Sequence, residues 1–367
     1  MTSAASLLTL TENADGFRDG CDGSRVGAVR IIAIHPGDAS GPARLAGARA
    51  PVPAVRAGTV RVRVGAAGVN PADVLQVRGL YPPPSGAPAW PGLEVAGTVT
   101  AVGPDVADVT PGTRVAALLP GGGYAEEVVV PSQHVWRVPE PLDDAHAAAL
   151  PEALCTAWSS LVDVGRLTAG ETVLVHGGAG GVGSVAAQVA LVRGCRVVTT
   201  ARGGARVAAV HELLAPALAH ARAHGAGAGA LTVVDREHDD ATDVVRGLGG
   251  ADVVLDVVGA ANLDRNVHAL ARDGRLVVIG LLKGRRGELD LGELLARRGT
   301  VVGTTLRSRS DAEKAAIVAA VREHVWPLVA AGVVRPHVHA RVPFARAADA
   351  HALLGSGEVV GKVVLVP

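Results

Sequence analysis

The chain has 367 residues, of which 49% are hydrophobic, so it can build one large or two medium domains with a substantial core. Its 35 basic and 35 acidic residues give a net charge of zero, which argues against a nucleic-acid or membrane-surface partner. Three widely spaced cysteines exclude a disulfide framework and a four-cysteine zinc site, and no apolar run reaches the roughly 18 residues of a membrane helix, so we expect a cytoplasmic protein.

The first part of the chain reads as an extension followed by strands. Residues 1–27 lack the basic start and apolar centre of a signal peptide, and we expect a flexible N-terminal extension, with a wrongly chosen start codon as the alternative. Closely spaced Pro and Gly then separate short apolar runs, which indicates an all-β region. The expected strands are 29–34, 59–64, 95–102 and 114–119. A proline-rich segment at 81–86 interrupts the series and predicts an ordered surface or active-site loop.

From about residue 153 the pattern changes to strands that alternate with helices. Such alternation predicts a doubly wound parallel sheet. The expected strands are 173–176, 196–200, 231–234, 252–257, 275–279 and 301–305. A helix over 311–328 then leads to short strands that end at 361–366 and return to the β-rich part. We therefore predict a β-rich domain formed by 28–152 and 307–367, a Rossmann domain at 153–306, and a cleft between them.

A glycine-rich turn stands between the first expected parallel strand and a small, alanine-rich helix. Gly177, Gly180 and Gly183 are spaced three apart in this turn. Glycine permits a sharp turn and lets the backbone approach a pyrophosphate closely, and the helix that follows offers unpaired N–H groups to the anion. The spacing differs from the usual G-x-G-x-x-G, and an ordinary turn in a glycine-rich chain is the alternative. The position between strand and helix favours a dinucleotide site.

The end of the second expected parallel strand distinguishes the two nicotinamide cofactors. An NAD site places Asp or Glu there to bind the ribose 2′-hydroxyl. This chain instead has Arg202 and Arg206. Arginine binds phosphate well, and two cations at a helix start are unfavourable without an anion, so the sequence favours NADPH with both arginines on the 2′-phosphate. Two solvated arginines are the alternative.

Four segments together carry a family resemblance. They are 68–73 (Gly-Val-Asn-Pro-Ala-Asp), 91–97 (Pro-Gly-Leu-Glu-Val-Ala-Gly), 119–126 (Leu-Pro-Gly-Gly-Gly-Tyr-Ala-Glu) and the glycine-rich turn. From Val29 to Pro367 the chain resembles the zinc-free quinone oxidoreductase branch of the medium-chain dehydrogenase/reductase family. The resemblance implies a GroES-like β-rich catalytic domain, a Rossmann domain that binds NADPH, and hydride transfer to a quinone-type acceptor.

The same resemblance bears on metal binding. Zinc enzymes of this family hold their catalytic zinc with Cys, His and Cys, and the aligned positions here are Asn70, Leu93 and Glu152. A leucine cannot ligate zinc, and the four-cysteine structural lobe is missing. His220 and His224 stand four apart on an expected helix without an acidic partner, which favours a polar helix surface over a metal site. We predict no metal.

Two residues are candidates for contact with the acceptor. Quinone reduction requires the protein to orient the acceptor, exclude water and stabilise developing negative charge on oxygen. The resemblance implies that Tyr81, in the proline-rich loop, contacts the quinone or gates the site, and that Asn70 takes the lost metal-ligand position. A loop-packing tyrosine and a turn asparagine before Pro71 are the alternatives. Asp73 and Gln76 are expected to support the loop rather than react.

The resemblance also assigns cofactor contacts beyond the three spaced glycines. Gly181 and Val182 are expected to bind pyrophosphate with them, Gly280 and Leu281 to border the nicotinamide ribose, and Lys362 to lie close to the cofactor, with a plain surface lysine as the alternative. Asp235 stands where an acid would repel the 2′-phosphate.

The resemblance further predicts a homodimer through the edge strand Thr300–Leu306. An NADPH-dependent quinone oxidoreductase is the leading interpretation. NADPH-dependent reduction of the C=C bond of an enoyl compound or 2-alkenal is the second, with Tyr81 as proton donor. A non-catalytic NADPH-binding protein is the third.

Overall fold

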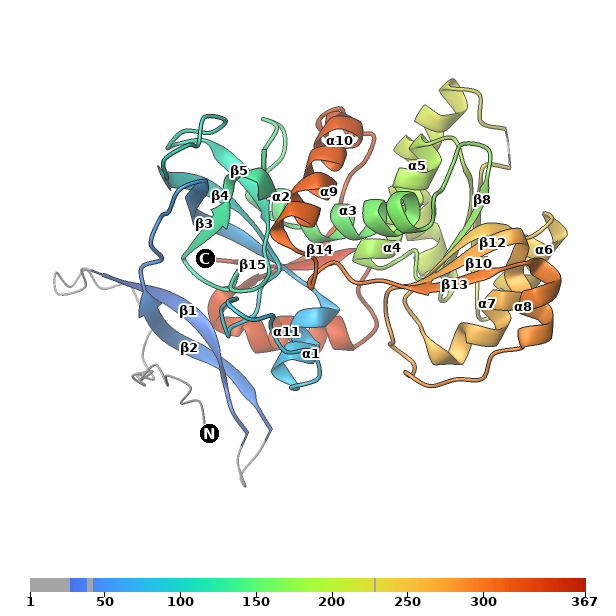
Figure 1. The fold of residues 1–367 in the computed structure, drawn as a ribbon, viewed down its shortest axis with the longest axis horizontal. Helices are drawn as coiled ribbons and strands as arrows, with labels where there is room; N and C mark the ends of the chain where they lie inside the picture. The colour runs from blue at the N-terminus through green and yellow to red at the C-terminus, as the bar shows by residue number, and fades with distance from the viewer. Residues whose placement is uncertain (1–26, 38–41, 228) are drawn as a thin grey trace. The chain divides into compact units, whose positions relative to one another are not determined.

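The computed structural model describes residues 27–37, 42–227 and 229–367; the expected extension, apart from residue 27, lies outside them. The chain divides into two compact units (Figure 1). The first contains residues up to Val138 together with 340–357 and 363–367, and the second contains 139–339 and 358–362. Both units are formed from segments that are distant in sequence.

The first unit is built on antiparallel strands. The strand and helix bounds in chain order are β1 Ala28–His35, β2 Arg44–Pro51, β3 Thr59–Val69, α1 Pro71–Val77, β4 Glu94–Val102, β5 Arg114–Leu118, β6 Glu127–Pro131, β7 Val135–Arg137, β14 Val338–Pro343, α11 Ala347–Gly355 and β15 Lys362–Val366. Seven strands form one sheet in the order β14-β15-β3-β4-β5-β7, with β6 paired to β3. The remaining two, β1 and β2, form a separate hairpin.

Alternating burial fixes the register of this sheet. In β3, Val60, Val62 and Val64 are almost completely buried, whereas Arg63 between them is exposed. A shift of one residue would move the valines to the solvent face, so the predicted alternation specifies the pairing. Short 3₁₀ turns at Ser132–His134 and Phe344–Arg346 complete the unit.

The second unit is a six-stranded parallel sheet with helical crossovers. The strands are β8 Thr172–Val175, β9 Arg196–Ala201, β10 Leu231–Asp235, β11 Ala251–Asp256, β12 Leu270–Val278 and β13 Thr300–Gly303. Their order in the sheet is β10-β9-β8-β11-β12-β13. The order reverses at β8, where a doubly wound sheet opens its binding crevice. Together with the β-rich unit, this confirms the predicted mixed α/β fold class.

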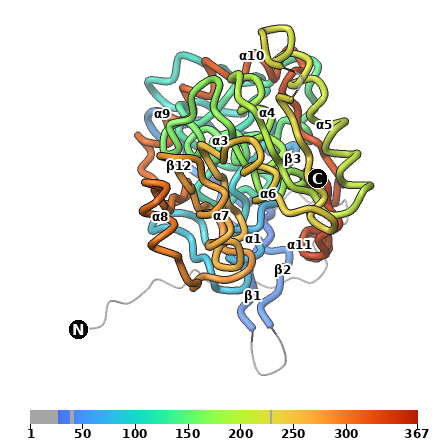
Figure 2. The backbone as a smooth tube through the Cα atoms, turned by 90° about the vertical axis from the view of Figure 1, so that its right-hand side faces the viewer, coloured from blue at the N-terminus to red at the C-terminus, as the bar shows by residue number. Residues whose placement is uncertain are grey.

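Helices pack on both faces of the parallel sheet. Their bounds are α2 Asp144–Ala148, α3 Pro151–Trp158, a π-helix Ser159–Val164, α4 Gly181–Val192, α5 Gly204–Ala223, α6 Ala241–Gly247, a 3₁₀ turn Ala260–Asn262, α7 Leu263–Ala269, α8 Leu291–Arg297, α9 Asp311–His324 and α10 Trp326–Ala330. Helices α4 and α5 contact each other and strands β8 to β10, whereas α6, α7 and α8 form the other group (Figure 2).

The unit boundaries differ from the predicted domain bounds. Residues 139–152 and 307–339 belong to the same unit as the parallel sheet. The reason is packing, because α3 contacts α4 and α9 contacts α3. The expected helix over 311–328 is two helices, α9 and α10, with Pro327 near the start of the second. Within the described residues, no helix combines the length and apolar character needed to cross a membrane.

Candidate functional site

The glycine-rich turn joins the end of β8 to the start of α4. Gly177 has φ +75°, a conformation that side chains disfavour. A Cβ atom on Gly183 would collide with the carbonyl oxygen of Gly177, so the first turn of α4 packs directly on the backbone that precedes it. Gly180 is the N-cap, and α4 begins at Gly181. Glycine is therefore required here both for backbone conformation and for close approach.

The start of α4 offers hydrogen-bond donors to an anion. Ser184 is the first residue of α4 whose N–H donates to a helical carbonyl, that of Gly180, at 2.9 Å. The N–H groups of 181–183 precede it in the first turn, where α-helices leave their donors without an intrahelical acceptor. The helix runs for 12 residues, so its dipole adds to the attraction. This arrangement can bind a phosphate group.

The segment Gly361–Lys362 lies against the same turn. The N–H of Gly361 donates to the carbonyl oxygen of Ala179 at 2.7 Å, and Gly361 forms a parallel bridge with Gly180. A Cβ atom on Gly181 would collide with the side chain of Lys362. Lys362 is only 5% exposed, so it is not a plain surface lysine. The structure thus brings together two predicted elements that are far apart in sequence.

The turn is also attached to the end of β9. The N–H of Gly178 donates to the carbonyl oxygen of Thr200 at 2.9 Å, and the N–H of Gly177 donates to its hydroxyl at 3.0 Å. Arg202 follows β9 directly, so it lies two residues from this contact. Sequence reasoning did not select Thr200, because a threonine at a strand end carries no distinct signal.

Two acids surround the predicted 2′-phosphate position. Nε of Arg202 donates to Oε1 of Glu237 at 2.9 Å. Asp235 accepts the N–H groups of Gly203, at 2.8 Å, and of Glu237, at 3.1 Å. These two backbone hydrogen bonds lower the pKa of Asp235. Arg206 donates through Nη1 to the carbonyl oxygen of Arg202 at 3.2 Å, so both arginines lie at the start of α5.

Gly280 and Leu281 follow β12 in a closely packed loop. A Cβ atom on Gly280 would lie 2.7 Å from the carbonyl oxygen of Val257. The N–H of Lys283 donates to the carbonyl oxygen of Val258 at 2.8 Å. Leu281 is 56% exposed. The loop backbone is therefore fixed while one apolar side chain stays accessible.

Asn70 lies in the first unit, at the N-cap of α1, and is 4% exposed. Its Nδ2 donates to Oε1 of Glu94 at 2.9 Å. Its backbone N–H donates to Oδ2 of Asp73 at 2.8 Å, and Oδ1 of Asp73 accepts the N–H of Gly92 at 2.8 Å. Both carboxylates are completely buried. Asp73 therefore holds the backbone at Asn70 and at Gly92, while the contact with Glu94 was missed.

A second layer of buried polar groups stands behind Asp73. Burial, together with the charge and hydrogen bond of Asp73, raises the pKa of Tyr124 well above its ordinary value. The Tyr124 hydroxyl lies 3.0 Å from Nε2 of His351. Burial and the nearby Arg78 lower the pKa of His351 to about 4, so the ring is neutral near pH 7.

Tyr81 follows α1 and is half-buried in the proline-rich loop. Nε2 of Gln76 donates to the carbonyl oxygen of Ala89 at 2.8 Å, so α1 holds the far end of this loop. Nε1 of Trp90 donates to the carbonyl oxygen of Gly122 at 2.9 Å. These two hydrogen bonds hold the chain at Ala89 and Trp90, and the supporting role of Gln76 toward residues 81–86 stays a prediction.

Two of the three aligned metal positions are described by their contacts. Leu93 is 1% exposed and contributes to the core, and Asn70 directs its amide nitrogen at Glu94. Across 27–37, 42–227 and 229–367, no three His, Cys, Asp or Glu side chains gather in a geometry that could hold a metal ion. The rings of His220 and His224 lie 4.2 Å apart, and Nδ1 of His224 contacts the carbonyl oxygen of His220.

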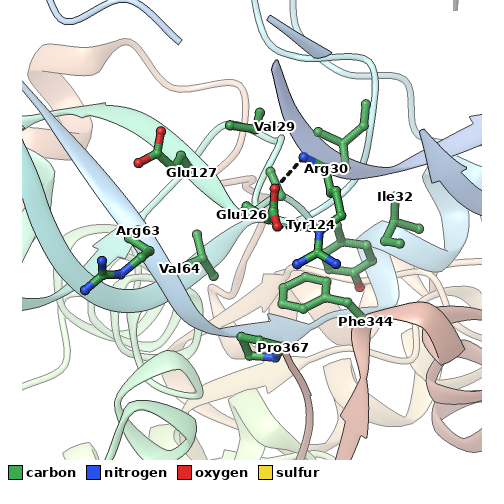
Figure 3. A pocket seen from close by; sticks show the side chains of 12 residues that line it. Val29, Arg30, Ile32, Arg63, Val64, Tyr124, Glu126, Glu127, Phe344 and Pro367 are labelled. Carbon is green, nitrogen blue, oxygen red and sulfur yellow. Dashed lines mark hydrogen bonds and ion pairs between the residues drawn. The ribbon is translucent and has the colours of Figure 1, made fainter. Parts of the chain in front are cut away.

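A cavity of about 410 Å³ lies elsewhere in the first unit (Figure 3). Its wall is largely apolar, and an ion pair between Arg30 and Glu126 stands beside it. The apolar lining residues include Ile31, Ile32, Val64, Tyr124 and Phe344. None of the predicted site residues lines it.

Two family models and several known proteins match this chain. Residues 56–140 match the family of alcohol dehydrogenase GroES-like domains, and residues 228–365 match a family described as zinc-binding dehydrogenase. The synaptic vesicle membrane protein VAT-1 homolog of Rattus norvegicus is 32% identical over 332 residues, which cover 86% of this chain and 78% of that protein. The quinone oxidoreductase of Homo sapiens is 29% identical over 325 residues, covering 86% and 91% respectively.

Solved structures include a similar enzyme. The crystal structure of Escherichia coli quinone oxidoreductase complexed with NADPH superposes with a TM-score of 0.75 at 25% identity. The similarity covers 92% of this chain and 100% of that one.

Proposed function

Because the chain belongs to the medium-chain dehydrogenase/reductase family, a family of oxidoreductases, we propose that it is a zinc-independent NADPH:quinone oxidoreductase. Quinone oxidoreductases are among its relatives, and one of them has been solved with NADPH. The observation that carries the proposal is the glycine-rich turn, in which helix donors, Lys362 and the end of β9 meet. The predicted cytoplasmic location stays a prediction.

The residues of the second unit fit a dinucleotide phosphate. Gly177, Gly180, Gly181, Val182 and Gly183 would hold the pyrophosphate, since side chains at the close approaches would fill the space that the backbone uses. Lys362 adds a cation at the same helix end. A cation at a helix N-terminus opposes the helix dipole, and a bound anion would offset that repulsion.

Selectivity for NADPH is proposed to depend on Arg202 and Arg206. Both lie at the start of α5, where two cations oppose the helix dipole and a phosphate would reverse that penalty. The carboxylate of Asp235 accepts two backbone N–H groups, and these hydrogen bonds reduce the repulsion expected between Asp235 and the 2′-phosphate. Glu237 competes with the phosphate for Arg202. Gly280 and Leu281 are proposed to border the nicotinamide ribose.

The proposed reaction needs few side chains to take part directly. NADPH, when bound, supplies the hydride. Asn70 is proposed to donate a hydrogen bond to the acceptor oxygen as negative charge develops there, because its amide is buried and held in one place. Tyr81 is proposed to contact the acceptor from the ordered loop and to exclude water. No metal is required in this proposal, because Leu93 occupies one of the three aligned ligand positions.

Reduction of an activated C=C bond is the second candidate. It needs the same hydride donor and a proton for the α-carbon. The observation that favours it is the half-buried phenol of Tyr81, which can supply that proton.

We also propose a homodimer through the exposed edge of the parallel sheet. Strand β13 ends the sheet and is mostly exposed. Val301 on this strand is 36% exposed, and Leu291 and Leu295 on α8 are 62% and 78% exposed. Unpaired strand edges and accessible leucines mark association surfaces. Size-exclusion chromatography with light scattering tests this, and a monomer at micromolar concentration would contradict it.

The deciding experiment follows reduced nicotinamide oxidation with 1,4-benzoquinone, 9,10-phenanthrenequinone and a 2-enal. Quinone turnover that prefers NADPH and resists a chelator supports the proposal. Turnover of the enal alone moves the function to C=C reduction. NADPH binding by fluorescence without any turnover favours a non-catalytic binding protein.

A further inference from the structure

The amide of Asn70 is held by a carboxylate from a neighbouring strand. Glu94, the first residue of β4, accepts the hydrogen bond from Nδ2 across 2.9 Å. Asn70 is 4% exposed and Glu94 is completely buried. A hydrogen bond in such a low-dielectric environment is stronger than in water, and a buried polar atom that loses its partner is costly. The contact is therefore strong enough to set the orientation of the amide.

A different carboxylate holds the backbone of Asn70. Asp73 accepts its N–H at 2.8 Å and the N–H of Gly92 at 2.8 Å. Asp73 thereby ties the start of α1 to the turn that leads into β4. The side chain of Asn70 also accepts the backbone N–H of Asp73 in a capping box, so Asp73 holds the oxygen end of the amide and Glu94 holds the nitrogen end. A change at Glu94 therefore releases the nitrogen end while Asp73 still holds the helix end.

An asparagine amide has a donor end and an acceptor end, and rotation by a half turn exchanges them. A carboxylate only accepts hydrogen bonds, so Glu94 selects the orientation with Nδ2 toward itself. A glutamine in its place could receive either end. We propose that Glu94 is a positioning residue, which fixes one orientation of the Asn70 amide toward the acceptor. This inference rests on the proposed contact between Asn70 and the acceptor.

The first test is a double-mutant cycle with quinone as acceptor. Loss of a positioned donor costs about 10²-fold or more in kcat, and we expect that loss for Asn70→Ala. Glu94→Gln permits the wrong orientation and is expected to lower kcat roughly tenfold, with the NADPH dissociation constant unchanged. In the Asn70→Ala background, Glu94→Gln is expected to lower kcat less than about twofold further, because the two residues act as one unit.

Glu171→Gln is the matched control. It makes the same carboxylate-to-amide change at a part-buried ion pair with Arg275 in the second unit. We expect it to lower the melting temperature and to leave kcat unchanged. Equal kcat values for Glu94→Gln and wild type, or effects of Glu94→Gln that are the same with and without Asn70, would overturn the proposal.

A second readout does not depend on turnover. The side-chain amide signals of Asn70 are assigned in ¹⁵N-labelled protein by their loss in Asn70→Ala. One Nδ2 hydrogen is expected to be protected from exchange in wild type, and the pair is expected to shift and lose that protection in Glu94→Gln. Unchanged signals would refute positioning by Glu94. Absent turnover of every acceptor by wild type would instead refute the proposed function.

Discussion

Arg202 donates through Nε to Glu237 at 2.9 Å, so one of the two arginines proposed to bind phosphate is already paired with an acid. The ion pair is exposed, with 63% and 43% of the two side chains accessible. An exposed pair contributes little to stability, about 0.2 to 1 kcal/mol. The ion pair matters more for nucleotide binding, because Glu237 competes with the 2′-phosphate for the guanidinium of Arg202.

We therefore expect Glu237→Gln to increase affinity for NADPH by about two- to five-fold, the equivalent of an exposed ion pair. Affinity for NADH, which lacks the 2′-phosphate, is expected to stay the same. Arg206→Ala is the opposing variant and is expected to weaken NADPH binding roughly tenfold. Fluorescence titration with both nucleotides measures each constant. Parallel changes for the two nucleotides would place the 2′-phosphate elsewhere.

Two glycines of the turn are expected to respond differently to alanine. A Cβ on Gly183 would collide with the backbone of Gly177, which cannot move without rebuilding the turn, so Gly183→Ala should cost about 1–3 kcal/mol and abolish NADPH binding. A Cβ on Gly181 would meet the flexible side chain of Lys362 instead. Gly181→Ala should keep the melting temperature within a few degrees and still weaken NADPH binding. Thermal unfolding and nucleotide titration separate the two effects, and equal losses of stability would contradict the packing argument.

The neutral ring of His351 makes stability depend on pH. Its pKa is lowered to about 4 in the folded chain, against 6.5 as the ordinary value. The folded state therefore binds fewer protons, and this contribution is complete above pH 6.5 and is lost as the pH falls toward 4. One pKa unit corresponds to about 1.4 kcal/mol, so the loss is at most roughly 3 kcal/mol.

Denaturant unfolding of wild type and His351→Gln between pH 7 and pH 4 measures this dependence. The glutamine variant should be less stable at pH 7 and should lose less on acidification. If the free energy of unfolding depended on pH identically in both proteins, His351 would not be the source of the dependence.

Arg275 is expected to be sensitive even to lysine. Its Nε donates to the carbonyl oxygen of Gly165 at 2.8 Å, while Nη1 and Nη2 donate to the two carboxylate oxygens of Glu171 at 2.9 and 3.1 Å. Lysine cannot reproduce this planar set of donors. Arg275→Lys should destabilise the fold by about 3 kcal/mol. Arg265→Lys, at the exposed pair with Asp240, is the control and should change stability by less than about 0.5 kcal/mol.

The fold was predictable where the sequence repeats a pattern over a whole element. All six parallel strands were expected at positions that overlap their observed bounds, because most of them are apolar runs bordered by turn residues. Strand β2, at Arg44–Pro51, was missed. Its residues Arg-Leu-Ala-Gly-Ala-Arg-Ala-Pro include none that is β-branched, and it is a strand because it pairs with β1 from Ala28↔Pro51 to His35↔Arg44.

Some parts of the candidate site could be recognised in the sequence and others could not. The glycine-rich turn is contiguous in sequence and could be recognised directly. Glu237 and Glu94 could not, since each acts through a side-chain contact across 35 and 24 residues. A single sequence carries no signal for such contacts.

Strand β15 has a consequence for how the chain is made. It pairs with β3 through Val363↔Val69, Val364↔Gly68 and Leu365↔Ala67. During synthesis on the ribosome, this edge of β3 therefore has no native partner until residues 363–365 emerge. The six strands of the parallel sheet are all complete by Gly303. The parallel sheet of the second unit can thus form before the sheet of the first unit is complete. The unpaired edge of β3 is where protection by a chaperone would be needed longest.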